Sequence, residues 1–200
     1  MYLQERPPGR APGTRTPLMV PAEHSGASIA AVNPFGSADV MAILRERAWL
    51  RGDATPEQAA WCERAATMLG GHAADRAALA ELLDLVFQYN AREIIARADS
   101  PVVLSRYAAR DVLRQVARML LEGAPLTSER FKEVVTALKE GMDLRGRELF
   151  HPIRLALAGR AGEGELDRVI LLLDEASVLS FTVPVKSAGS RILEFCSSMD

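Results

Sequence analysis

Residues 144–174 read LRGRELFHPIRLALAGRAGEGELDRVILLLD. Within this stretch apolar residues recur every four positions, at Leu149, Ile153 and Leu157. That spacing places them on one face of a helix, which Gly159 ends. Pro152 lies inside the pattern and predicts a kink or a restart of the helix there. After Gly162 and Gly164, residues 165–176 (ELDRVILLLDEA) predict another short helix. The stretch therefore favours helices and contains no strand pattern.

Upstream of this stretch, helical patterns fill the chain from residue 37 onward. Each begins at a residue suited to capping: Ser37, Thr55 before Pro56, Asp75, Ser100 before Pro101, and Thr127 or Ser128. The predicted helices cover residues 38–51, 56–69, 76–87, 101–122 and 128–141. Strands nowhere alternate with helices. The sequence therefore predicts an all-α bundle of about seven helices with no internal repeat.

Three regions differ in composition. Residues 1–36 contain six prolines and four glycines and follow neither helical nor strand period, which predicts a disordered arm. Residues 37–179 form the predicted helical domain. Residues 180–200 lose the helical pattern, with an extended segment at 181–183 before Pro184, and predict an irregular tail.

The overall composition excludes several classes of protein. The 200 residues are 48% hydrophobic and 25% charged, which is ordinary for a soluble globular chain. No apolar run approaches the length needed to span a membrane. Cys62 and Cys196 match no metal or redox spacing, which indicates a reduced, cytoplasmic protein. The net charge of −2 gives no general attraction to nucleic acid, so we expect no DNA binding, and any RNA contact must come from a local patch.

Candidate catalytic groups are scattered. His24, His72 and His151 lie in three different segments, and none has a second ligand at metal-binding spacing. The sequence has no glycine-rich phosphate loop and no nucleophile elbow. His151, followed by Pro152, is best interpreted as a packing position at a kink. We therefore expect no catalytic site, no metal and no cofactor in this chain.

The clearest charge pattern lies in the longest predicted helix, 101–122. Four arginines recur there at every fourth residue: Arg106, Arg110, Arg114 and Arg118. They would form a ridge along one face, suited to RNA phosphates, because guanidinium groups bind phosphate well. The opposite, buried face would carry Val103, Leu104, Tyr107, Leu113, Val116 and Leu120. The alternative is an ordinary solvated face, since arginine outnumbers lysine 21 to 3 among the 24 basic residues.

A second basic group surrounds the predicted helix in residues 144–159. Its members are Arg145, Arg147, Arg154 and Arg160. They bracket a helix start and a helix end, where backbone amides can help to bind an anion. Together with the ridge, these arginines are the candidate RNA-binding residues.

The stretch 144–174 also resembles the C-terminal anticodon-binding region of bacterial glutamyl-tRNA synthetase. That family carries a pattern like G-(K/R)-x-L-(F/M)-x-P-(L/I)-R-x-A-L-T-G-R, then G-P-E-L and a leucine-rich helix. The positions that match are Gly146, Leu149, Phe150, Pro152, Arg154, Ala156, Leu157, Gly159, Arg160, Glu165 and Leu166. Weaker similarity extends over residues 39–179. The resemblance implies the α-helical anticodon-binding fold of class I aminoacyl-tRNA synthetases.

The same resemblance implies a function and its limits. It implies a tRNA-binding module, with tRNA(Glu) as the first candidate partner and a separate catalytic synthetase subunit as a second. The family's ATP-handling signatures do not occur in this sequence, so we expect no glutamate activation by this chain alone. Two alternatives stay open. The chain could be a helical scaffold whose RNA face has decayed, as Gly70 and Gly71 suggest where relatives carry basic residues, or a fragment of a full synthetase gene.

Overall fold

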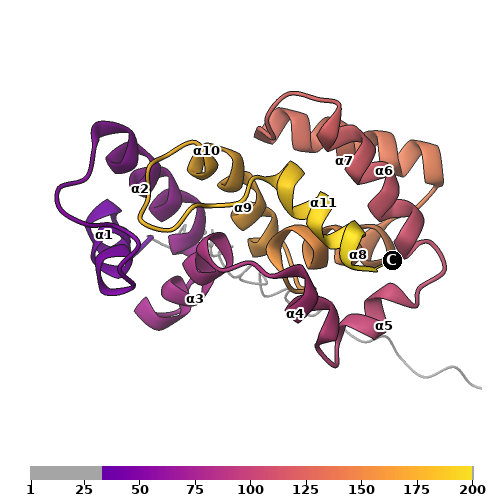
Figure 1. Cartoon of the computed structure of the whole chain (residues 1–200), viewed down its shortest axis with the longest axis horizontal. Coiled ribbons are helices and arrows are strands. Elements are labelled where there is room, and N and C mark those ends of the chain that lie inside the picture. The colour runs from indigo at the N-terminus through magenta and orange to yellow at the C-terminus, as the bar shows by residue number, and fades with distance from the viewer. Residues whose placement is uncertain (1–32, 200) are drawn as a thin grey trace, which may run out of the picture. The chain divides into compact units, whose positions relative to one another are not determined.

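In the computed structural model, which describes residues 33–199, every regular element is helical (Figure 1). The elements are α1 (Ser37–Glu46), α2 (Pro56–Leu69), the 3-10 helix η1 (Gly70–His72), α3 (Arg76–Phe87), α4 (Ala91–Ala96), α5 (Ser100–Leu104), α6 (Ala109–Leu121), α7 (Ser128–Met142), α8 (Gly146–Ala158), α9 (Glu165–Leu171), α10 (Leu173–Ser177) and α11 (Ala188–Met199). The predicted all-α fold is confirmed for these residues. The predicted number of about seven helices is too low, because two long segments are broken and η1, α4 and α11 were not predicted.

Three predicted helix caps are confirmed. Thr55, Asp75 and Thr127 each accept a hydrogen bond from a backbone N–H in the first turn of α2, α3 and α7. The start of α1 differs from the prediction, because Gly36 and not Ser37 is its cap residue. Gly36 has no side chain with which to cap the helix. Its own backbone N–H donates to the carboxylate of Asp39 at 2.9 Å, so this donor at the start of α1 is satisfied.

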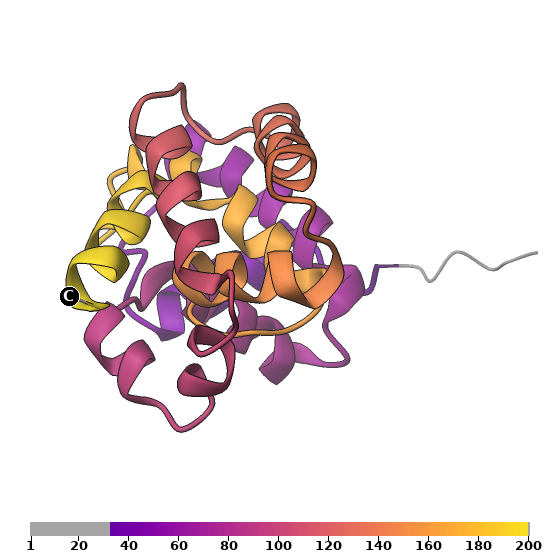
Figure 2. The same cartoon turned by 90° about the vertical axis from the view of Figure 1, so that its right-hand side faces the viewer.

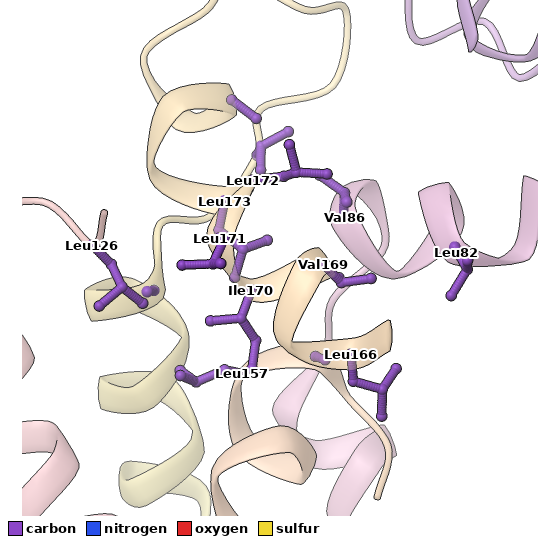
Figure 3. Close-up of a cluster of buried hydrophobic side chains, with 14 of the residues drawn as sticks. Leu82, Val86, Leu126, Leu157, Leu166, Val169, Ile170, Leu171, Leu172 and Leu173 are labelled. Atoms are coloured by element: carbon purple, nitrogen blue, oxygen red, sulfur yellow. The ribbon is translucent and has the colours of Figure 1, made fainter. Parts of the chain in front are cut away.

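Helices α8 and α9 join the two ends of this helical region. α8 packs against α5, α6, α9 and α11, and α9 packs against α2 and α3 (Figure 1). The side chains between them are leucine, isoleucine and valine, as Figure 3 shows around Leu157, Leu166, Val169 and Ile170, all of which are buried. The leucine-rich stretch within residues 144–174 therefore builds the centre of the core.

The predicted single helix over residues 101–122 is wrong. A turn at 105–108 separates α5 from α6. Val103 and Val112 are both buried, yet nine residues of continuous α-helix would turn them two and a half times and point them to opposite faces. The turn brings both side chains into the core, so burial of apolar surface outweighs the continuity of the helix.

The predicted helix over residues 165–176 is also interrupted, at Leu172. Five consecutive residues, 169–173, are buried, which one stripe of a helix could not achieve. The carbonyl of Leu172 accepts a hydrogen bond from the indole Nε1 of Trp61 at 3.2 Å. A side chain of α2 thus satisfies a buried backbone group at the interruption.

The predicted irregular tail is wrong for residues 188–199, which form α11. Its buried positions are Ala188, Arg191, Ile192 and Phe195, which follow helical spacing. Arg191 interrupts the apolar pattern, and this is why the helix was missed. Its guanidinium is completely buried and donates to the carbonyls of Leu85, Val86, Leu157 and Lys186.

The predicted disordered arm, residues 1–36, lies outside the described residues except for its last four. Those four belong to the helical domain. The side-chain amide of Asn33 donates to the carbonyl of Ala66 at 2.8 Å, and Phe35 packs against the core. The domain therefore begins a few residues before the predicted boundary at residue 37.

Candidate nucleic-acid interface

The α6 arginine face consists of Arg110, Arg114 and Arg118. All three side chains are exposed. Arg110 has no ionic partner among the described residues, and the other two have weak ones: Arg114 lies 3.3 Å from Asp111 and Arg118 lies 3.8 Å from Glu122. Exposed pairs of this kind contribute little, so the guanidinium groups remain available to an external anion. Three of the four predicted ridge residues therefore lie on α6, on the face of that helix that is not buried. Figure 2 shows the position of α6 in the fold.

The fourth predicted ridge residue, Arg106, is elsewhere. It lies in the turn between α5 and α6, and its side chain reaches the first turn of α8. There Nη1 donates to the carbonyl of Arg147 at 3.0 Å, and Nε lies 3.8 Å from Glu148. Arg106 thus joins a different group, which we call the α8-start cluster and define as Arg106, Arg145 and Arg147.

The α8-start cluster borders a cleft of about 530 Å³ between α7 and α8. The cleft is lined by Thr136, Lys139, Glu140, Asp143, Arg145, Gly146 and Phe150. Arg145 is exposed and has no ionic partner among residues 33–199, whereas Arg147 lies 3.7 Å from the exposed Glu163. Lys139 stands over the ring of Phe150, with its Nζ 5.6 Å from the ring centre. The cleft therefore combines cationic side chains with a half-buried aromatic ring.

The structure does not bring the second predicted group together. Arg154 is buried, and its guanidinium binds both carboxylate oxygens of Asp167 at 2.7 and 2.8 Å and the carbonyl of Gly162 at 2.6 Å. Arg160 lies beyond the other end of α8 from Arg145, separated by 13 residues of helix, about 20 Å. Arg154, which matches the arginine of the family pattern, holds the loop after α8 in place and is not free to bind RNA.

The pKa of His151 is affected by these arginines. Burial lowers its pKa, and the positive charges of Arg106, Arg147 and Arg154 lower it further. The interpretation of His151 as a packing position agrees with its place inside α8, next to the buried Pro152. The lowered pKa of His151 disfavours its charged form in this region.

Tyr107 is not on a buried face, contrary to the prediction. Its side chain is fully exposed in the turn between α5 and α6. The prediction assumed one continuous helix, and the turn rotates this residue outward. No pattern of apolar residues could have revealed it, because Tyr107 fits the helical period of its neighbours.

Two further kinds of feature, a metal-ligand cluster and a membrane span, are absent from residues 33–199. No three His, Cys, Asp or Glu side chains are grouped as metal ligands would be. None of the described helices is both long enough and apolar enough to cross a membrane.

The described residues thus form a strand-free helical domain with exposed arginines on α6 and at the start of α8. The family model of the anticodon binding domain matches residues 31–180, and the chain belongs to that family. The resemblance that residues 144–174 indicate is thereby confirmed.

Among curated proteins, the chain is similar to glutamate–tRNA ligases. It is 36% identical over 80 residues to glutamate–tRNA ligase 2 of Syntrophus aciditrophicus, which covers 40% of this chain and 16% of that protein. It is 27% identical over 144 residues to glutamate–tRNA ligase of Exiguobacterium sibiricum, which covers 69% of this chain and 28% of that protein. The chain thus spans less than a third of the length of these relatives. No solved structure matches it.

Proposed function

We propose that this chain binds tRNA through the α6 arginine face and the α8-start cluster. The observation that supports this proposal most directly is the exposure of Arg110 and Arg145 without ionic partners among the described residues. An unpaired guanidinium on a helix with like charges one turn away is unfavourable in isolation. Phosphate groups along the RNA backbone would relieve that repulsion and accept two parallel hydrogen bonds from each guanidinium.

Because the net charge is −2, the protein as a whole does not attract RNA, and the attraction would come from the local arginine groups. Acidic side chains accompany the arginines at Asp111, Glu122 and Glu148, and each of these carboxylates is exposed. Exposed ion pairs of this kind exchange readily for stronger contacts with phosphate. The binding would therefore be confined to one side of the molecule and would weaken steeply as salt rises.

The names of the relatives suggest the finer identity of the partner. Because they are glutamate–tRNA ligases, tRNA(Glu) is the first tRNA to test. The attachment of glutamate to that tRNA would be performed by a separate catalytic subunit, and the chain would act beside it in the cytoplasm without consuming ATP itself.

The first test is charge reversal on α6. We expect the variant Arg110→Glu/Arg114→Glu to lose measurable binding to a tRNA(Glu) transcript in fluorescence anisotropy at moderate salt. Both residues are exposed, so the far-UV circular dichroism of the variant should equal that of the unmodified chain.

A matched control is Arg51→Glu/Arg168→Glu. It changes the net charge equally, and both side chains are exposed and unpaired among the described residues, yet they lie outside the two basic surfaces. This control should keep most of the affinity. Equal loss in both double variants would show that only net charge matters, and the absence of salt-dependent binding by the unmodified chain would refute the proposed function.

A further inference from the structure

Tyr107 is the one aromatic side chain that is exposed in the part of the chain that the structure describes. The other exposed large apolar side chains are aliphatic: Val102, Leu121, Val178, Val183 and Leu193. Of all these, Tyr107 is the only one whose whole surface faces solvent. An aromatic ring presented this fully offers both of its faces to a flat partner.

The turn that carries Tyr107 is held firmly. On either side of the turn, Val103 and Ala108 are buried. The N–H of Arg106 donates to the carbonyl of Val103 at 3.3 Å, and the N–H of Ala109 donates to the carbonyl of Arg106 at 3.1 Å. The backbone at Tyr107 is therefore fixed before any ligand arrives, which lowers the entropic cost of binding.

Tyr107 lies between two arginines in the sequence of the turn and the start of α6. Arg106 precedes it in the turn and reaches the first turn of α8, where its Nη1 donates to the carbonyl of Arg147. Arg110 follows it at the start of α6 and is exposed without an ionic partner in residues 33–199. Tyr107 thus stands where the α6 arginine face meets the α8-start cluster. A nucleic-acid strand that contacts both surfaces would pass over this turn.

We propose that Tyr107 is a stacking site for an unpaired base of the bound RNA. This inference rests on the proposed function. Proteins hold single-stranded RNA by combining cations along the backbone with aromatic rings under the bases, and the turn supplies both. A protein partner is the less favoured occupant, because Arg106 and Arg110 lie on either side of Tyr107 along the chain and the centres of protein interfaces are depleted in charge.

The test compares Tyr107→Ala with Tyr107→Trp on two RNA probes. The first probe is a tRNA(Glu) transcript, which contains unpaired loops, and the second is a fully paired RNA duplex. We expect Tyr107→Ala to bind the transcript roughly 5- to 150-fold more weakly, the range found when one stacking ring is removed. Its affinity for the duplex and the slope of its affinity against salt should stay unchanged, because no phosphate contact is lost.

Tyr107→Trp should keep the affinity, and its exposed indole should be quenched when the transcript binds. Trp49 and Trp61 are buried and provide a constant background. Val178→Ala, an exposed apolar truncation away from the arginines, should change nothing.

The outcomes separate the two proposals. If the unmodified chain binds the transcript and Tyr107→Ala binds it equally well, the stacking site is refuted and the proposed function stands. A salt slope that falls in Tyr107→Ala would also refute it, since the ring would then act through the arginines. If the unmodified chain binds no tRNA, both proposals fail. Because Tyr107 is fully exposed, a thermal melt of Tyr107→Ala should match that of the unmodified chain.

Discussion

Two arginines within ten residues of each other show how burial decides the role of a charge. Arg145 is exposed and unpaired among the described residues, whereas Arg154 is buried and makes three hydrogen bonds to Asp167 and Gly162. Arg154 also lies with its guanidinium carbon 4.9 Å from the centre of the Phe150 ring. The first is available to a ligand, and the second stabilises the connection from α8 to α9.

Removal of Arg154 tests this assignment. We expect Arg154→Ala to lower the free energy of unfolding by about 3 kcal/mol, because the carboxylate of Asp167 loses its partner in a largely buried site. Urea denaturation followed by circular dichroism measures the change. The exposed pair offers the control: Arg114→Ala should cost less than about 1 kcal/mol. A variant Arg154→Ala as stable as the unmodified chain would contradict the structural role.

At the scale of elements, α11 is bound to the rest of the domain by a buried charge. Arg191 donates to carbonyls near the C-terminal ends of α3 and α8, where the helix dipoles are negative. Burial lowers its pKa to about 10, so the side chain remains charged at neutral pH. The face of Tyr89 covers the guanidinium, with 4.6 Å from its carbon to the ring centre.

We expect Arg191→Met to lower the free energy of unfolding by at least about 3 kcal/mol, because four buried carbonyl groups lose their donor. The free energy of unfolding of Arg191→Lys should lie between those of Arg191→Met and the unmodified chain, since an ammonium group cannot reach carbonyls on two helices at once. Thermal and urea unfolding measure both. The neighbouring Leu193→Ala, on the exposed side of α11, should cost less than about 1 kcal/mol. Equal loss at both positions would contradict a specific role for Arg191.

At the scale of the whole helical domain, the proposed interface depends on helices that pack against each other. α6 and α8 are in direct contact, and α6 also contacts α11 and α7 (Figure 2). The direct contact between α6 and α8 sets the spacing of the α6 arginine face from the α8-start cluster. If one tRNA contacts both surfaces, the two groups of arginines must act on the same binding event.

This predicts how neutral variants change the dependence of affinity on salt. Arg110→Gln/Arg114→Gln and Arg145→Gln/Arg147→Gln should each lower the slope by about 2, and the fourfold variant by about 4, since each lost phosphate contact lowers it by nearly one. Anisotropy titrations with tRNA(Glu) at several salt concentrations give these slopes. If the α8-start pair leaves the slope unchanged, that cluster does not contact the RNA and the interface is confined to α6.

Much of this architecture follows from local patterns. Thr55, Asp75 and Thr127 cap helices as predicted, and the leucine-rich residues 165–173 form the centre of the core. Caps and apolar spacing act between residues a few positions apart, so the sequence carries them directly. The motif in residues 144–166 was likewise sufficient to indicate the family.

Which arginines are free was decided by contacts between distant segments. Arg106 does not lie on α6 with the other predicted ridge residues, because the burial of both Val103 and Val112 requires a turn. The same turn exposes Tyr107. Arg191 completes the core because carbonyl groups from residues 85, 86 and 157 converge on it. The sequence by itself determined the all-α class, most of the helices and the family, through short-range periodicity and motif. Only the tertiary structure decided which charges hold the fold and which face solvent, because a charged side chain finds its partner in space and not along the chain.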